Sequence, residues 1–112
     1  MNPQGLGDLE QLVLLAVVRL RGDAYAVSVR NEIEARTSRS ISRGAVYVTL
    51  DRLARKGYLR SELGSPTPER GGKAKRMFFI EDEGLMALRS NLEGLKEMMK
   101  GLSHSIALNW TP

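Results

Sequence analysis

Apolar residues are dense in the first helix that the sequence predicts, which covers about residues 9–20 with Asp8 as a candidate N-cap. A core stripe recurs at three- and four-residue spacing, and further apolar side chains occupy the other faces. A helix that is apolar nearly all round has to be buried on more than one side. A central core helix in a monomer would satisfy this pattern, but we expect a second subunit to cover the second side. The residues expected at that contact are Leu9, Leu12, Leu14, Leu15 and Val18.

A second helix is predicted over about residues 24–37, after the Arg21-Gly22 break. Asp23 is its candidate N-cap. Tyr25, Val29 and Ile33 recur at four-residue spacing and are expected to point inward. The charged residues between them are expected to face solvent.

A third helix, residues 42–57, follows a short turn and has both ends marked. Ser42 is a good N-cap, and Gly57 suits the left-handed position that closes a helix. Its apolar stripe is formed by Val46, Leu50 and Leu53. The other faces carry basic, hydroxylic and aromatic side chains, which suit a DNA groove, although a solvated surface helix would look similar. Helix, short turn and helix together are the layout of a helix-turn-helix.

The hydrophobic period changes after Gly57. Residues 58–63 alternate and predict a strand, and residues 76–80 predict a second one. The Gly- and Pro-rich basic segment between them predicts a loop. A hairpin with a long basic tip, directly after a helix-turn-helix, predicts a wing, a name that we use for residues 64–76.

Leucines dominate the last predicted helix, which begins near residue 81 with acids that favour the positive end of its dipole. Its apolar positions recur alternately at three and four residues, which is a heptad seam. The seam consists of Leu85, Leu88, Leu92, Leu95, Met99, Leu102 and Ile106. A body of about eighty residues cannot bury this whole stripe, so we expect it to pack on the last or the first helix of a second subunit.

Positive charge is concentrated in one third of the chain. Residues 39–76 hold ten Lys and Arg against three acids, whereas the 112-residue chain as a whole has a net charge of +4. Such a footprint attracts a polyanion, of which DNA is the commonest in a cytoplasm. The chain has no cysteine, no apolar run of membrane-spanning length and no basic signal-peptide start, so we expect a cytoplasmic protein without membrane association.

Residues suited to catalysis are scarce. His104 is the only histidine and lies in the expected C-terminal tail, and no carboxylate pair occurs in an apolar setting. Gly71-Gly72-Lys73 lacks the strand–loop–helix context of a phosphate-binding loop. We therefore expect neither an enzyme nor a bound cofactor or metal. RNA is a less suitable ligand than DNA, because the strands lack exposed aromatic pairs for base stacking.

The segments LEQLVLLAVVRL, SRGAVYVTLDRLARKGYLRSELG and PTPERGGKAKRMFFI resemble, in order and spacing, PadR-like winged-helix transcriptional regulators of the short subfamily. The resemblance covers about residues 6–90 and implies sequence-specific DNA binding, most often for repression. The implied fold is mainly α with a small β-hairpin (α+β): a winged helix-turn-helix in residues 1–80, then a C-terminal dimerisation helix and tail in residues 81–112. Val48 departs from the pattern, since many relatives have proline there.

The expected DNA contacts lie in the turn before the third helix, on that helix and in the wing. They are Ser40, Ser42, Arg43, Tyr47, Thr49, Arg52, Arg70, Lys73, Lys75 and Arg76. Arginine can read guanine through two hydrogen bonds, while wing cations would hold the flanking backbone.

The expected partners are double-stranded DNA, read as an inverted repeat, and a second copy of the chain in a homodimer. A small-molecule effector could bind at the dimer interface. The alternative is a protein-interaction adaptor that uses the leucine seam and the basic patch without binding DNA.

Overall fold

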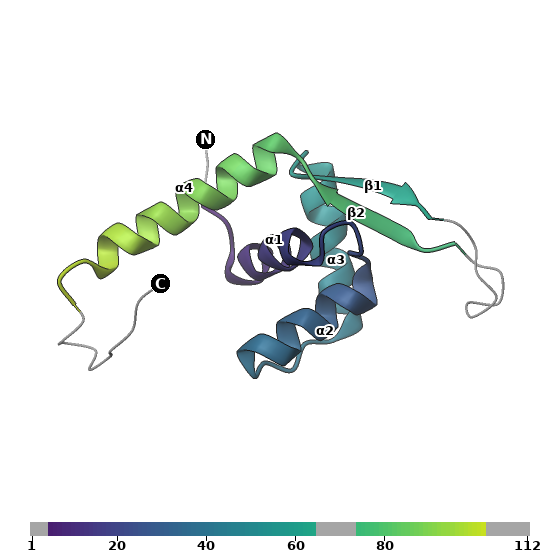
Figure 1. Cartoon of the computed structure of the whole chain (residues 1–112), viewed down its shortest axis with the longest axis horizontal. Coiled ribbons are helices and arrows are strands. Elements are labelled where there is room, and N and C mark those ends of the chain that lie inside the picture. The colour runs from purple at the N-terminus through teal and green to yellow at the C-terminus, as the bar shows by residue number, and fades with distance from the viewer. Residues whose placement is uncertain (1–4, 65–73, 103–112) are drawn as a thin grey trace.

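The computed structural model describes residues 5–64 and 74–102. Its elements are α1 (Asp8–Leu20), α2 (Ala26–Thr37), α3 (Arg43–Arg55), β1 (Leu59–Leu63), β2 (Arg76–Ile80) and α4 (Asp82–Met99). The first three helices pack together into one body (Figure 1). The hairpin extends from one end of this body, and α4 extends from the body in the opposite direction. This arrangement confirms the predicted winged helix-turn-helix, with four helices and one antiparallel hairpin in the described residues.

The core forms around α1, which contacts α2, α3, β2 and α4. Val13, Leu14, Ala16 and Val17 of this helix are buried within the single chain. The predicted role of Leu14 at a subunit contact is therefore wrong: its side chain is fully covered by its own subunit. The other residues predicted for that contact remain accessible, since Leu9, Leu12 and Leu15 are half-buried and Val18 is exposed.

Two helix starts differ from those predicted. Gly7 precedes α1, and its backbone N–H donates to Oε1 of Glu10 at 2.9 Å, so Asp8 is the first helical residue and not the cap. Tyr25 precedes α2, and its N–H donates to the hydroxyl of Ser28 at 2.9 Å. In both helices the side chain of the third helical residue accepts from the backbone N–H of the cap residue. This bond is one half of a capping box.

Both predicted ends of α3 are confirmed. The Ser42 hydroxyl accepts from the backbone N–H of Ala45 at 3.1 Å. Gly57 has φ of 84°, and its N–H donates to the carbonyl of Ala54 at 3.1 Å. Tyr58 N–H donates to the Leu53 carbonyl at 3.0 Å, which completes a Schellman motif. The helix thus has a fixed start and a fixed end on the body of the protein.

The hairpin is joined to the core at its base. Leu59 pairs with Ile80 and Leu63 with Arg76, as expected for the two predicted strands. Phe78 is buried, and its N–H donates to the Ala24 carbonyl at 2.8 Å. These contacts hold the hairpin at a fixed angle to the helical body.

The start of α4 lies against the base of the hairpin. Glu81 N–H donates to the Tyr58 carbonyl at 3.0 Å, and Gly84 is buried one turn later. A Cβ at Gly84 would overlap the carbonyl oxygen of Tyr58 and lie 3.1 Å from Cγ1 of Ile80. Glycine at this position therefore permits the close approach of α4 to the strand, which offsets its poor helix propensity.

Candidate nucleic-acid interface

The outward face of α3 is continuous and largely uncovered. Arg43, Tyr47, Val48, Arg52 and Arg55 are exposed, whereas the apolar stripe of Val46, Leu50 and Leu53 faces the core. Four of these five exposed side chains are basic or aromatic, which matches the prediction of a cationic face. Val48 was not among the predicted contacts, although it is 52% exposed.

Thr49 does not belong to this face. It is only 3% exposed, and its hydroxyl donates to the carbonyl of Ala45 at 2.8 Å. The predicted DNA contact at Thr49 is therefore wrong. The helical period places Thr49 beside the buried stripe. It lies there at the edge of a hollow shared with Leu9 and Glu10 of α1, and not on the exposed face.

Arg76, the first residue of β2, is bonded to the outward face of α3. Its Nη1 donates to the Tyr47 hydroxyl at 2.8 Å and to Oδ1 of Asp51 at 3.1 Å. Arg55 donates from Nε to Oδ2 of the same carboxylate at 3.1 Å. These hydrogen bonds, from Arg55 first and then from Arg76, lower the pKa of Asp51 and keep it ionised. Arg76 was predicted to contact the DNA backbone, but its guanidinium is hydrogen-bonded to Tyr47 and Asp51 of the protein itself.

Lys75 lies at the same junction, where the wing meets the start of α2. Its Nζ lies 4.2 Å from the ring centroid of Tyr25, within range of a cation–π contact. A small groove of about 190 Å³ opens here between Tyr25, Val27, Tyr47 and Lys75. The predicted wing contacts Arg70 and Lys73 lie outside the described residues.

A buried carboxylate fixes the other edge of α3. Glu10 of α1 is 6% exposed, and its Oε2 accepts from Nζ of Lys56 at 2.8 Å. Nη1 of Arg52 lies 3.7 Å from the same oxygen. Burial by itself would raise the pKa of Glu10, but the bonds from Lys56 and Gly7, with the charges of Lys56 and Arg52, lower it overall. This ion pair was not predicted from the sequence, because the three-residue spacing from Gly7 to Glu10 signals the start of α1 and not the pairing with Lys56.

Three exposed polar residues lie at the start of α3: Ser40, Ser42 and Arg43. The Ser42 hydroxyl accepts from Ala45 as the helix cap. Arg43 forms no hydrogen bond or ion pair with any residue in the described part of the chain. A free guanidinium beside the positive end of a helix is suited to bind an anion or the acceptor edge of a base.

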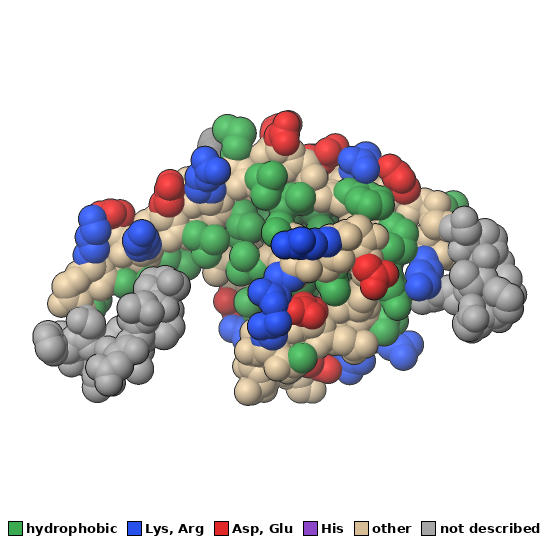
Figure 2. Space-filling view, in the orientation of Figure 1, with side chains coloured by type: hydrophobic (Ala, Val, Ile, Leu, Met, Phe, Trp, Pro, Cys, Tyr) green, Lys and Arg blue, Asp and Glu red, His purple; other side chains and the backbone are tan. Residues whose placement is uncertain are grey.

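A long apolar strip on α4 is uncovered in the single chain. Leu85, Leu92, Leu95 and Leu102 are between 37% and 46% exposed, and Met99 is half-buried. Hydrophobic side chains run along the lower edge of α4 in Figure 2, and charged ones lie mostly along its upper edge. The strip borders a groove of about 660 Å³. Leu88 differs from its neighbours, since it is 6% exposed and packs in its own core. It also lines this groove, so its place at the subunit contact stays a prediction. Ile106 lies outside the described residues.

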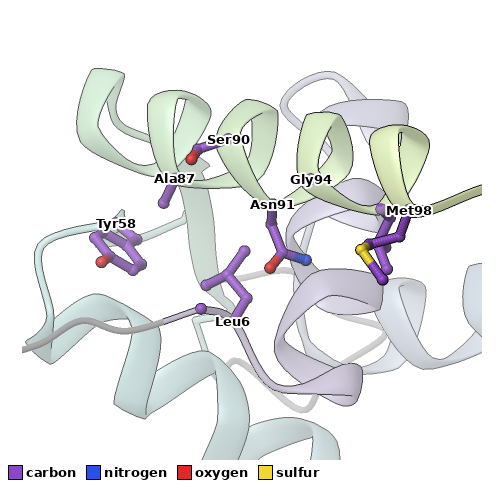
Figure 3. A pocket seen from close by; sticks show the side chains of 9 residues that line it. Leu6, Tyr58, Ala87, Ser90, Asn91, Gly94 and Met98 are labelled. Carbon is purple, nitrogen blue, oxygen red and sulfur yellow. The ribbon is translucent and has the colours of Figure 1, made fainter.

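A second hollow, of about 690 Å³, lies between α4 and the segment before α1 (Figure 3). Leu6, Tyr58 and Met98 supply apolar walls, while Ser90 and Asn91 supply polar groups. The Asn91 amide donates to the side-chain oxygen of Gln11 and so ties α4 to α1. Leu95 borders both this hollow and the apolar groove.

In residues 5–64 and 74–102, no group of three or more His, Cys, Asp or Glu could hold a metal ion. None of the helices described there is both long and apolar enough to cross a membrane.

A helix-turn-helix followed by a hairpin, with a basic exposed face on its last helix, defines the winged-helix class. The family model of the "Transcriptional regulator PadR-like family" matches residues 14–90. The chain therefore belongs to the PadR-like family, whose members are transcriptional regulators and not enzymes. Among curated proteins, no sequence matches it significantly.

Solved structures share the fold at low sequence identity. A PadR family transcription regulator from Clostridium difficile R20291 has a TM-score of 0.72 at 16% identity, over 89% of this chain and 99% of that one. A PadR family regulator from Eggerthella lenta DSM 2243 has a TM-score of 0.67 at 26% identity, over 91% and 88% of the two chains. F93 from STIV, a winged-helix DNA-binding protein, has a TM-score of 0.68 at 20% identity, over 88% and 98%.

Proposed function

We propose that this regulator is a homodimer that binds duplex DNA sequence-specifically and represses transcription. One observation carries the proposal: the outward face of α3 is exposed, and Arg76 joins it to the base of the wing through Tyr47 and Asp51. Helix and wing can then contact one ligand together. In this assignment residues 1–80 bind DNA, and residues 81–112 bring two copies together.

The contacts divide into base reading and backbone positioning. Arg43 is assigned to a guanine edge, because its guanidinium is open and lies at the start of α3. Tyr47 accepts a hydrogen bond from Arg76, so its own hydroxyl proton remains available for a phosphate oxygen. Ser40 and Ser42 lie where the free N–H groups of the helix start favour phosphate. Backbone contacts along the wing are assigned to Arg70, Lys73 and Lys75.

Arg52 is assigned a lesser role. Its side chain is 50% exposed, but its guanidinium is near the Glu10 carboxylate. A phosphate that recruits Arg52 would have to compete with that attraction. We therefore expect Arg43→Ala to weaken duplex binding more than Arg52→Ala does.

The uncovered strip on α4 supports dimerisation. Its leucines repeat with heptad spacing, and an apolar groove runs along them. We propose that the strip packs on the partner copy, assisted by the accessible leucines of α1. A two-fold axis would then place two α3 helices on an inverted repeat, with half-sites about 34–36 Å apart, which is one turn of DNA. A dimer bound in this way to a promoter would exclude other proteins from the duplex.

The hollow in Figure 3 is the proposed effector site. Its volume of about 690 Å³ lies within the usual range for small-molecule pockets. Apolar walls with a few polar groups, here Ser90 and Asn91, are typical of such sites. Because Leu95 also borders the proposed subunit contact, a bound molecule would alter the packing of the two copies.

A gel shift on the duplex upstream of the chain's own coding sequence, at moderate salt, tests the DNA proposal. Wild-type protein should retard the duplex, and Arg43→Ala should weaken the affinity about 5- to 150-fold, as expected for loss of a contact worth about 1–3 kcal/mol. Arg36→Ala is the control, since Arg36 is exposed on α2 but bonded to Glu32. No retardation by folded wild-type protein would reject the proposal and favour the protein-interaction adaptor.

A further inference from the structure

The middle of the α3 face contains two residues that the contacts described so far leave unused. Val48 is 52% exposed, and Gly44, one helical turn before it, is exposed as well. Residues four apart lie next to each other on one helix face. Together they form a small apolar area on the helix surface, with charged and aromatic side chains around it.

Neither the backbone conformation nor the packing of the described residues requires glycine at position 44. Its φ is not positive, and a Cβ built on Gly44 would meet no other atom within 4 Å. Alanine would therefore fit and would favour the helix. A gap of this kind on an outward face is suited to a surface that approaches from outside the protein.

The polar side chains around Val48 are already engaged. Asp51 accepts from Arg55 and Arg76, Tyr47 accepts from Arg76, and Arg52 lies near Glu10. Val48 itself can neither donate nor accept a hydrogen bond. A single exposed valine is ordinary on a protein surface, but this one lies on the face of α3 that, in the proposed function, reads base edges in the major groove.

We infer that Val48 reads the 5-methyl group of a thymine, with Gly44 giving the room for that base to approach. Among the groups that base pairs present in the major groove, the thymine methyl is the apolar one. The inference rests on the proposed function and adds a base preference to it. Val48 is thus a specificity-determining residue, paired with the guanine-reading Arg43.

The test begins with duplexes selected from a random pool by the wild-type protein. Each thymine of the selected site is then replaced in turn by deoxyuridine, which lacks only the 5-methyl group. At one thymine in each half-site we expect the replacement to weaken binding about three- to fivefold, the effect of leaving one methyl group unburied. Replacement at the other thymines should leave the affinity unchanged.

The variant Val48→Ala identifies the residue responsible. It should bind the thymine and deoxyuridine duplexes equally, with an affinity close to that of wild type for the deoxyuridine duplex. Circular dichroism checks that the variant folds, which is expected because Val48 is exposed. Wild-type binding that ignores every replacement, or a Val48→Ala variant still sensitive at the same thymine, would overturn the inference alone. Failure of the wild type to select any duplex would reject the proposed function with it.

Discussion

Glu10 offers a quantitative test of how α3 is held on the body. Removal of one partner from a buried ion pair costs about 3–5 kcal/mol, whereas exposed pairs contribute about 0.2–1 kcal/mol. The Glu10 side chain is 7% exposed, but that of Lys56 is 42% exposed and can be rehydrated. Glutamine keeps an oxygen that can accept from Gly7. We therefore expect Glu10→Gln to lower the free energy of unfolding by about 1–2 kcal/mol, between the two limits.

Urea unfolding at one fixed protein concentration measures this loss, because stability of a dimer would depend on concentration. The matched control is Glu32→Gln, which removes a carboxylate bonded to Arg19 and Arg36 at the surface. We expect the control to have a clearly smaller effect, since both guanidinium groups are open to water. Equal effects of the two substitutions would refute the buried anchor.

The contribution of Glu10 to stability depends on pH with a defined sign. The folded-state pKa of Glu10 is lowered from its ordinary value of 4.5, so its stabilising effect is complete above about 4.5 and is lost as pH falls through the lower folded pKa. The stability difference between wild type and Glu10→Gln should therefore narrow in acid. A difference that stays constant from neutral pH to about pH 3 would contradict the assigned ionisation of Glu10.

Three further substitutions test other parts of the structure. Gly84→Ala should lower stability by about 1–3 kcal/mol, because its methyl group would overlap the Tyr58 carbonyl, and an unchanged melting temperature in calorimetry would disprove that overlap. Leu92→Asp combined with Leu95→Asp should yield folded monomers in sedimentation equilibrium, and persistence of a dimeric mass would exclude the α4 strip as the subunit contact. Thr49→Val should leave duplex affinity within about twofold of wild type, since the side chain is buried, and a tenfold loss would restore Thr49 as a contact.

Local signals in the sequence predicted α3 well. Ser42 and Gly57 marked its ends because the cap and the left-handed turn depend only on neighbouring backbone groups. The hairpin strands were predicted for a similar reason, since alternation and the Gly- and Pro-rich loop are local features. Asp8 and Asp23 failed as caps because Gly7 and Tyr25 occupy the cap positions, with their own N–H groups donating to Glu10 and Ser28 inside each helix.

The long-range features could not be read from spacing. The bond from Arg76 to Tyr47 joins residues 29 positions apart, and the pair of Glu10 with Lys56 joins residues 46 apart. The burial of Thr49 and Leu14 depends on how closely α1 and α3 pack. Helical periodicity identifies the centre of a buried stripe, but it does not say whether the residues at the edges of the stripe are buried. A basic wing residue was therefore predicted to face DNA, although Arg76 is bonded to α3.

The salt dependence of duplex binding tests most directly whether α3 and the wing form one DNA-binding surface. Fluorescence anisotropy with a labelled duplex should give a log affinity that falls linearly with log salt concentration. Lys75→Ala should make the slope shallower by about 1 for each phosphate contact removed. Lys100→Ala, at the far end of α4 and paired with Glu97, should leave the slope unchanged. Absence of binding at low salt, or the same slope for wild type and Lys75→Ala, would contradict the account.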